Sequence, residues 1–458
     1  MKKIKRGIVS SVMLGIFWVS CYSASLLAAG EPEEGLHLDS SGTDEIHIAE
    51  KARLPELVAY AYDRNPAIQA ARDAWRAAVE KYRISTSLPD PQFMVTYFPQ
   101  PIETRLGPQD WNASFSQRFP FPGRLSREGE VVEQEVLIAR LGMDKTVRDV
   151  SVSIQESYHE LLYIQQARSI AGRNAGLLDE LRKISETAYA EDRATFLDVA
   201  KSQSQTGQLR YDMLLLEELE DTERTQLNGF LNREPEAPIG KLAPVFTRPV
   251  VYTLEEIYAL AESRQEEILI ADARVEQAGR RIELAQYQNL PDFSLGLFYA
   301  SIGQPDVAMP PSGASDDAVG IQFGVSVPLW LGKNDSRVRQ ARAEAGKAQA
   351  MRTEQVNQSR TRIRTLFFKL RNAERLITLY GDEMIPQALS SMETAETWFR
   401  QGQGSFSDFV EIQATTYNFQ LSMARARADY GKALAGLERI AGLDLTQRET
   451  IAVKEGKP

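Results

Sequence analysis

Two acidic residues near the C-terminus have the type and spacing to act on ions. Asp408 and Glu411 are three residues apart in a helix-forming segment, so their carboxylates would share one helix face. A structural interpretation competes with this one. Ser405-Phe-Ser-Asp408 has the pattern of a capping box, and negative charge near a helix N-terminus is favourable without any further function.

An earlier segment of the chain repeats this pattern with one difference. Thr195-Phe-Leu-Asp198 also has the form of a capping box, but Lys201 occupies the place that corresponds to Glu411. A capping box at the start of this helix needs only Asp408, so capping does not explain the presence of Glu411. The difference between the two segments therefore favours an ion-controlling role for Asp408 and Glu411.

Other chemistry has little support in the sequence. His37, His47 and His159 are widely separated, and no cysteine pair or His-x-x-x-His motif accompanies them. Met94 and Met309 are isolated, as packing methionines usually are. We find no nucleophile elbow, phosphate loop or paired catalytic acids. The sequence predicts no metal site, no cofactor and no enzymatic activity.

The elements that position these acids come from an internal duplication. Leu54-Pro-Glu-Leu-Val-Ala-Tyr-Ala61 is echoed by Leu254-Glu-Glu-Ile-Tyr-Ala-Leu-Ala261, and Leu88-Pro-Asp90 by Leu290-Pro-Asp292. Repeats of this kind indicate one pseudo-symmetric body rather than several unrelated domains. We predict a first repeat at 51–240 and a second at 241–445, with a linker at 31–50 and a tail at 446–458.

The N-terminus has the features of an export signal. A basic start is followed by an apolar run at 8–19 and by small residues ending in Ala28-Ala29-Gly30, which predicts a signal peptide at 1–30. The run is too short to span a membrane as a helix. Cys21 is the only cysteine. It is either acylated, as in a lipoprotein, or removed with the signal.

The composition indicates a folded, acidic protein. Of the 458 residues, 43% are hydrophobic and 25% are charged, and the formal net charge is −10. No basic stripe alternates with aromatic residues. Nucleic acid is therefore not expected as a partner.

Long helices account for most of the chain. No proline occurs between Pro122 and Pro235, and apolar residues recur there at intervals of three and four. A helix over 126–190 would be about 100 Å long and would need neighbouring helices packed alongside it. Pro386 interrupts a later helical pattern and predicts a kink. Helices alone would also suit a soluble coiled-coil rod.

Four short segments, by contrast, alternate apolar and polar residues as β-strands do. We predict strands at about 92–98, 111–119, 293–299 and 319–327, joined in pairs by loops at 99–110 and 301–318. An apolar outer face and a polar inner face are typical of a transmembrane β-barrel. A half-buried hairpin in a soluble sheet gives the same alternation.

Four strands are too few to close a barrel. Open edges would leave backbone groups without hydrogen bonds in lipid, and about eight strands is the usual minimum. Three copies of the chain would supply twelve strands in a symmetric ring. The strand count therefore favours a homotrimer, although two or four copies also satisfy the arithmetic.

The order helix, strand, strand, long helix, tip, helix, repeated behind a signal peptide, resembles the TolC-like outer membrane efflux factors. The resemblance covers about residues 50–445 and includes the paired Leu-Pro-Asp segments and the turn Gly402-Gln-Gly-Ser-Phe-Ser-Asp408. The turn Phe119-Pro-Phe-Pro-Gly-Arg124 looks more like the heavy-metal branch of the family than the drug-export branch.

The resemblance implies a mainly α-helical fold with a transmembrane β-barrel. Three chains would form a twelve-stranded barrel in the outer membrane lipid of a Gram-negative bacterium, continuous with a helical tunnel in the periplasm. It would be the passive exit duct for small molecules or metal ions, working with a periplasmic adaptor protein and an inner-membrane pump. The alternative is a periplasmic coiled-coil adaptor or scaffold without a pore.

The resemblance also assigns residues to sites. The tips at 191–195 and 401–405 would form the periplasmic end of the tunnel. Asp408 and Glu411 match carboxylate rings that narrow it, and in a trimer six acids would attract cations and disfavour anions. Tip residues that are either adaptor contacts or plain turn residues are Arg193, Ala194, Gly402 and Gly404. The family often has larger or basic residues at Gly404.

Overall fold

In the computed structural model the sheet and the long helices come from both halves of the chain. The structure describes residues 48–448, apart from 192–194, 246, 402 and 404–405. These residues all belong to one compact unit, His47–Pro458. Cys21, Arg193, Ala194, Gly402 and Gly404 lie outside the described residues.

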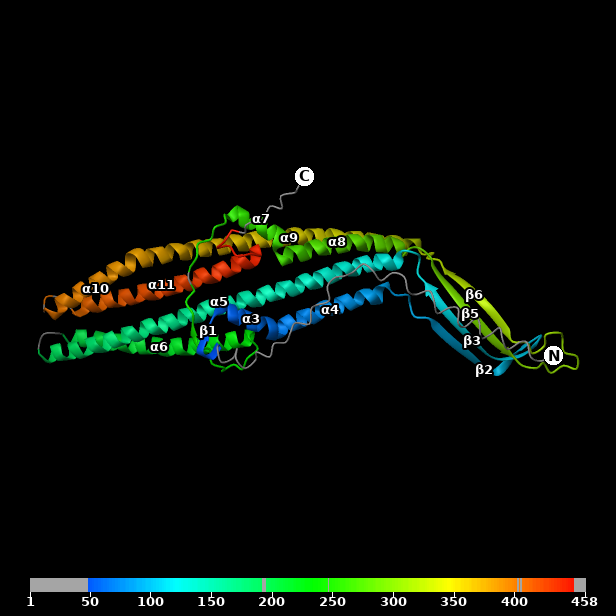
Figure 1. Cartoon of the computed structure of the whole chain (residues 1–458), viewed down its shortest axis with the longest axis horizontal. Coiled ribbons are helices and arrows are strands. Elements are labelled where there is room, and N and C mark those ends of the chain that lie inside the picture. The colour runs from blue at the N-terminus through cyan, green and yellow to red at the C-terminus, as the bar shows by residue number, and fades with distance from the viewer. Residues whose placement is uncertain (1–47, 192–194, 246, 402, 404–405, 449–458) are drawn as a thin grey trace, which may run out of the picture. The chain divides into compact units, whose positions relative to one another are not determined.

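The elements alternate between helices and short runs of strand (Figure 1). They are β1 (Lys51–Ala52), α3 (Leu54–Arg64), α4 (Pro66–Thr86), β2 (Gln92–Thr104), β3 (Gly107–Phe119), α5 (Arg124–Ala190), α6 (Phe196–Phe230), β4 (Lys241–Leu242), α7 (Leu254–Arg264), α8 (Glu266–Tyr287), β5 (Asp292–Ile302), β6 (Ala318–Ser326), α9 (Leu331–Thr378), the π-helical turn η1 (Leu379–Met384), α10 (Ile385–Arg400) and α11 (Phe406–Ala441).

Local sequence signals set where the helices begin. The side chain of Asn65 accepts hydrogen bonds from the backbone N–H groups of Ala67 and Ile68 and so caps α4. A capping box formed by Thr253 and Glu256 starts α7. Gly123, with a φ of 88°, makes the left-handed turn that leads from β3 into α5. α5 contains 67 residues, close to the helix predicted over 126–190.

The helix with the predicted kink changes its hydrogen bonding just before the proline. η1 lies between α9 and α10, and Pro386 occupies the first turn of α10. Proline lacks the N–H that a regular helix would use, and a π-helical turn allows the chain to continue without it.

The helices that lead to the sheet follow the same spatial order as the strands. α4 packs against α5, α5 against α8, and α8 against α9. The four-stranded sheet has the order β2-β3-β5-β6, and all of its neighbouring strands are antiparallel. Figure 1 shows each of these helices joined to a strand at the same end.

The duplication is also visible in the packing. Leu57 and Ile257 occupy equivalent positions on α3 and α7, and both are fully buried. Leu227 and Leu437 are buried in the corresponding clusters. The two clusters are therefore two versions of one helical core.

One predicted loop is largely strand. The segment 99–110 was expected to connect two strands, but β2 extends to Thr104 and β3 begins at Gly107. The pairing between the two strands is irregular from Tyr97 to Ile102, where Pro99 and Pro101 lie. Proline is tolerated here because β2 is an edge strand of this sheet, and the irregularity accommodates the missing donors.

Candidate functional site

One face of the four-stranded sheet is mainly apolar on all four strands, with Gln117 of β3 as a polar member. The strand register places Phe93 opposite Phe115, Phe115 opposite Leu297, and Leu297 opposite Ile321. Further rows on this face contain Val95, Tyr97, Trp111, Ala113, Phe119, Phe293, Leu295, Tyr299, Val319, Phe323 and Val325. Phe93 is 70% exposed and Ile321 is 77% exposed. A large exposed apolar face marks contact with lipid or with another protein.

The opposite face of the sheet carries small and polar side chains. Residues of this parity are Gln92, Met94, Thr96, Asn112, Ser114, Ser116, Arg118, Ser294, Gly296, Phe298, Ala300, Ala318, Gly320, Gln322, Gly324 and Ser326. Met94 and Phe298 are its large apolar members. The sheet thus has the two-faced pattern expected from the sequence, with one mainly apolar face and one face of small and polar side chains.

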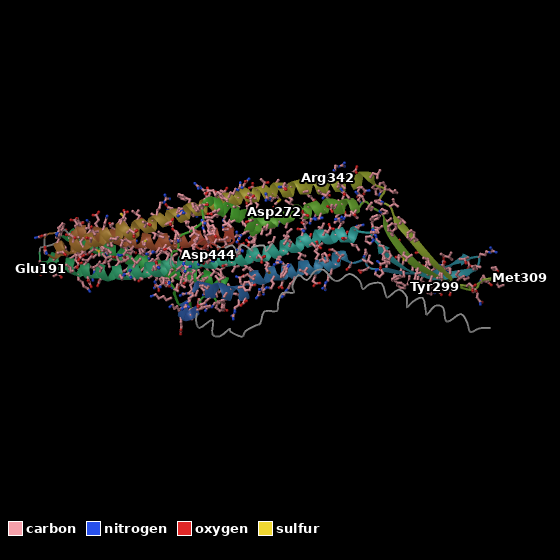
Figure 2. The ribbon with its side chains drawn as sticks, turned by 45° about the horizontal axis from the view of Figure 1, so that its top comes forward. Glu191, Asp272, Tyr299, Met309, Arg342 and Asp444 are labelled. Atoms are coloured by element: carbon pink, nitrogen blue, oxygen red, sulfur yellow. The ribbon has the colours of Figure 1, made fainter. Side chains whose placement is uncertain are left out.

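The far end of α5 belongs to a second region. A helix of 67 residues connects β3 to Glu191, a length of about 100 Å. Figure 2 labels Glu191 at the helix end and Tyr299 on the strands. α5 ends at Ala190 and α6 begins at Phe196, while α10 ends at Arg400 and α11 begins at Phe406. The two helix–helix turns fall at the predicted tips.

Asp408 and Glu411 lie on the exposed side of the first turns of α11. Between them, Phe409 and Val410 are 1% and 2% exposed and pack against residues of α5 that include Leu178. Packing of this pair fixes the orientation of the helix. Among the described residues, neither acid forms an ion pair, so both charges are available to the solvent.

The corresponding acid of the first hairpin has a local partner. Asp198 Oδ2 accepts hydrogen bonds from the backbone N–H of Thr195 at 2.9 Å and from its hydroxyl at 2.7 Å. Asp198 therefore completes a capping box with Thr195, the N-cap residue of α6, as the sequence pattern predicts. Ser405, the residue that would make the same cap with Asp408, lies outside the described residues.

Lys201 connects the two hairpins near these helix ends. Its ammonium group donates a hydrogen bond to the hydroxyl of Ser407, across from α6 to α11. The sequence comparison placed Lys201 where Glu411 lies in the other repeat, and the structure brings it beside the residue that precedes Asp408. A positive charge of the first repeat is thus held against the first turn of α11 in the second repeat.

A cleft of about 690 Å³ lies beside the contact between the middle of α5 and the C-terminal part of α11. His159 and Glu438 are among its lining residues. Burial lowers the pKa of His159 to about 4, with a further contribution from the charge of Lys432. Burial raises the pKa of Glu438 to about 7, although the N–H of Leu445 donates to its carboxylate at 3.0 Å and opposes that shift.

An ionic cluster borders this cleft and joins the two repeats. Arg439 of α11 is 7% exposed; its Nε lies 2.5 Å from Asp149 Oδ1 on α5, and its other nitrogens bond Glu267 on α8. Lys145 lies 2.5 Å from Asp149 and 3.7 Å from Glu267. Sequence reasoning missed this cluster because its members are far apart in the chain and belong to no motif.

In the part of the chain that the structure describes, no three His, Cys, Asp or Glu side chains are placed to hold a metal ion together. Nor does any described helix combine the length and the apolar character needed to cross a membrane.

Comparison with known proteins gives consistent findings. Residues 257–443 match the family model "Outer membrane efflux protein". No curated protein sequence matches the chain. The outer membrane protein VceC of Vibrio cholerae has 18% identity and a TM-score of 0.69, covering 86% of this chain and 96% of that one.

Two further solved structures share the fold. CusC, whose structures concern transmembrane channel formation, has 12% identity and a TM-score of 0.71, covering 85% and 92% of the two chains. The open state of the MtrE outer membrane channel of Neisseria gonorrhoeae has 15% identity and a TM-score of 0.69, covering 86% and 91%. The family model supports the predicted resemblance to outer membrane efflux factors over residues 257–443, and the solved structures confirm the predicted fold. Identities this low show the fold alone and do not distinguish the heavy-metal branch from the drug-export branch.

Proposed function

We propose that this chain, which carries an outer membrane efflux protein domain and has the fold of outer membrane channels, is the exit duct of a tripartite efflux system. It passively exports small molecules or metal ions that an inner-membrane pump and a periplasmic adaptor pass on. The observation that carries this proposal is the exposed apolar face of the sheet, joined to helices of about 100 Å. A duct needs both parts: strands that face lipid and a tunnel that crosses the periplasm.

The proposed assembly is a homotrimer in the outer membrane of a Gram-negative bacterium. The larger sheet of one chain has four strands and two open edges, and lipid does not tolerate unpaired backbone groups. Three copies supply twelve strands, which is within the usual range for barrels. A coiled-coil adaptor would have no use for the exposed apolar face. No observation favours that alternative.

The helix ends form the proposed periplasmic entrance. Asp408 and Glu411 of three copies would place six carboxylates around one opening and make it prefer cations. The tip residues Arg193, Ala194, Gly402 and Gly404 belong to the turns that we assign to adaptor contact.

Channel recordings in planar bilayers test the proposal. Purified wild-type protein should form heat-dissociable trimers and conduct ions with a preference for cations. The double variant Asp408→Asn/Glu411→Gln should lose much of that preference at unchanged trimer content. Asp198→Asn is the matched control, because this capped acid should affect helix stability and leave selectivity as it was. Recovery of the wild type as a soluble periplasmic monomer would refute the duct, and unchanged selectivity in the double variant would refute the role of the two acids.

A further inference from the structure

Positive charge is concentrated on the two outer helices of the row α4-α5-α8-α9. α9 carries twelve Lys and Arg residues against four Asp and Glu, and α4 carries four against two. The inner helices have the opposite balance, with nine against eleven on α5 and three against five on α8. The basic helices therefore lie at the edges of the row, in a chain whose formal net charge is −10.

Three cations on the part of α9 nearest the sheet do not pair with acids. Lys333, Arg339 and Arg342 are exposed, and among the residues that the structure describes none of the three forms an ion pair, although Asp335 and Glu344 belong to the same stretch. They lie within about 17 Å of the start of α9. Figure 2 shows Arg342 on the part of α9 near the strands. Helical side chains lean toward the N-terminus of their helix, so these cations lean toward the sheet.

Exposed apolar residues precede these cations. Leu329, Trp330 and Leu331, at the passage from β6 into α9, are 74%, 76% and 76% exposed. They follow the apolar face of the sheet, which the proposed function places in lipid. A tryptophan directly beyond an apolar span is typical of the membrane–water interface. The cations therefore begin at the level of the lipid headgroups, a layer about 5–8 Å thick.

A neighbouring copy of the chain does not supply the missing negative charge. α4 and α9 are the outer members of the row, so in the proposed ring of three copies α9 of one copy lies beside α4 of the next. Both helices carry a net positive charge, and like charges at short distance repel each other. An anion from outside the protein would reduce this repulsion.

We propose that the start of α9 binds anionic phospholipid headgroups of the periplasmic leaflet, such as phosphatidylglycerol. Lys333, Arg339 and Arg342 donate hydrogen bonds to phosphate oxygens, and the acyl chains pack against Leu329 and Trp330. Clusters of Lys and Arg beside a membrane span attract anionic lipids electrostatically. The inference rests on the proposed duct, because the duct places the sheet in a membrane. It adds the class of lipid that stabilises the assembly where two copies meet.

A second group of cations on the same helix provides a matched control. Arg362, Arg364 and Lys369 are exposed, and within the described residues none of them forms an ion pair. They begin about 45 Å from the start of α9, far beyond the headgroup layer. Replacing either group by glutamine removes three positive charges from α9, but only the group near the sheet can reach the membrane. The control variant is therefore Arg362→Gln/Arg364→Gln/Lys369→Gln.

Lipid addition to the purified trimer tests the inference. In a neutral detergent, phosphatidylglycerol should raise the temperature at which the wild-type trimer dissociates, and phosphatidylcholine should raise it much less. The variant Lys333→Gln/Arg339→Gln/Arg342→Gln should retain less than half of the rise with phosphatidylglycerol, whereas the control variant should retain nearly all of it. The rise should also shrink in about 1 M salt, because the Debye length falls there to about 3 Å.

Several results would overturn the inference. These are equal stabilisation by the two lipids, an equal loss of response in the two triple variants, and the same rise with inorganic phosphate at matched concentration, which would identify a free anion as the ligand. Native mass spectrometry gives a second readout, because phosphatidylglycerol should remain bound to the wild type and to the control variant. A wild type that is monomeric and non-conducting would instead refute the duct, whereas a conducting trimer that does not respond to phosphatidylglycerol would refute this inference alone.

Discussion

Replacing Arg439 by methionine should loosen the contact between the two repeats. The guanidinium group holds Asp149 on α5 and Glu267 on α8, and its side chain is only 6% exposed. Methionine keeps most of the apolar length but leaves two acids without their shared cation. The change therefore removes the charge interaction while nearly preserving the packing.

The magnitude follows from the burial of the partners. Removing one member of a fully buried ion pair costs about 3–5 kcal/mol. Here the acids are 38% and 19% exposed, and Lys145 remains within 4 Å of both. We therefore expect a loss of about 2–3 kcal/mol in the free energy of unfolding.

The pH dependence gives this prediction a second readout. Burial alone would raise the pKa of Glu267 and of Asp149, but the hydrogen bonds and positive charge of Arg439, with a further contribution from Lys145, outweigh it and hold both pKa values below their ordinary range. An acid whose pKa is lower in the folded state than in the unfolded state stabilises the protein at any pH above its unfolded-state pKa. This stabilisation is lost as the pH falls through the folded-state pKa. The difference between wild type and Arg439→Met should therefore shrink below about pH 4.

Urea unfolding of the detergent-solubilised protein, followed by helical circular dichroism, measures the effect. Arg76→Met is the control, because Arg76 pairs with Asp73 on the exposed surface of α4 and should contribute less than about 0.5 kcal/mol. A loss below about 1 kcal/mol at pH 7, or a difference that persists at low pH, would show that the cluster does not stabilise the contact as argued.

Two further predictions concern the cleft beside this cluster. Burial raises the pKa of Glu438 to about 7, so its neutral carboxyl stabilises the protein at low pH, and this stabilisation is lost as the pH rises through 7. Urea titrations of the wild type at several pH values should show a loss on the order of 2–3 kcal/mol in the free energy of unfolding. Glu438→Gln should show no loss from this group. Gly431→Ala should cost about 1–3 kcal/mol, because the added Cβ would overlap the buried imidazole of His159. The cost in thermal unfolding should fall by more than half when His159 is also replaced by alanine, and an equal cost in both backgrounds would contradict the overlap.

Sequence patterns predicted the elements that have a regular period or a clear break. The period of three and four predicted the helix that became α5, and Pro386 marked the place where η1 interrupts the helical hydrogen bonding. The same reasoning failed at 99–110, because prolines usually indicate a loop. An edge strand with an irregular register accommodates them, and the tertiary position of a strand is not visible in its own residues.

The site was predictable only where both partners lie in one short segment. Thr195 and Asp198 are three residues apart, so their capping box could be identified from the sequence. Arg439 and Asp149 are 290 residues apart and have no shared motif. Their contact depends on how α11 packs against α5, which periodicity alone does not specify.

The contacts between the repeats are graded along the helices, and this bears on how a duct would open. Near the middle of α5, the buried Arg439 cluster joins α5, α8 and α11 and contributes about 2–3 kcal/mol to the free energy of unfolding. Near the helix ends, the described polar links between the hairpins include the exposed hydrogen bond from Lys201 to Ser407 and the hydrogen bond from Gln413 to Asn174, and such a bond contributes only about 1 kcal/mol. Separating the hairpins at their ends therefore does not require breaking the buried ionic cluster of Arg439, whereas separating them in the middle does. Motion concentrated at the ends would move Asp408 and Glu411 while leaving the sheet and the middle of the helices in place.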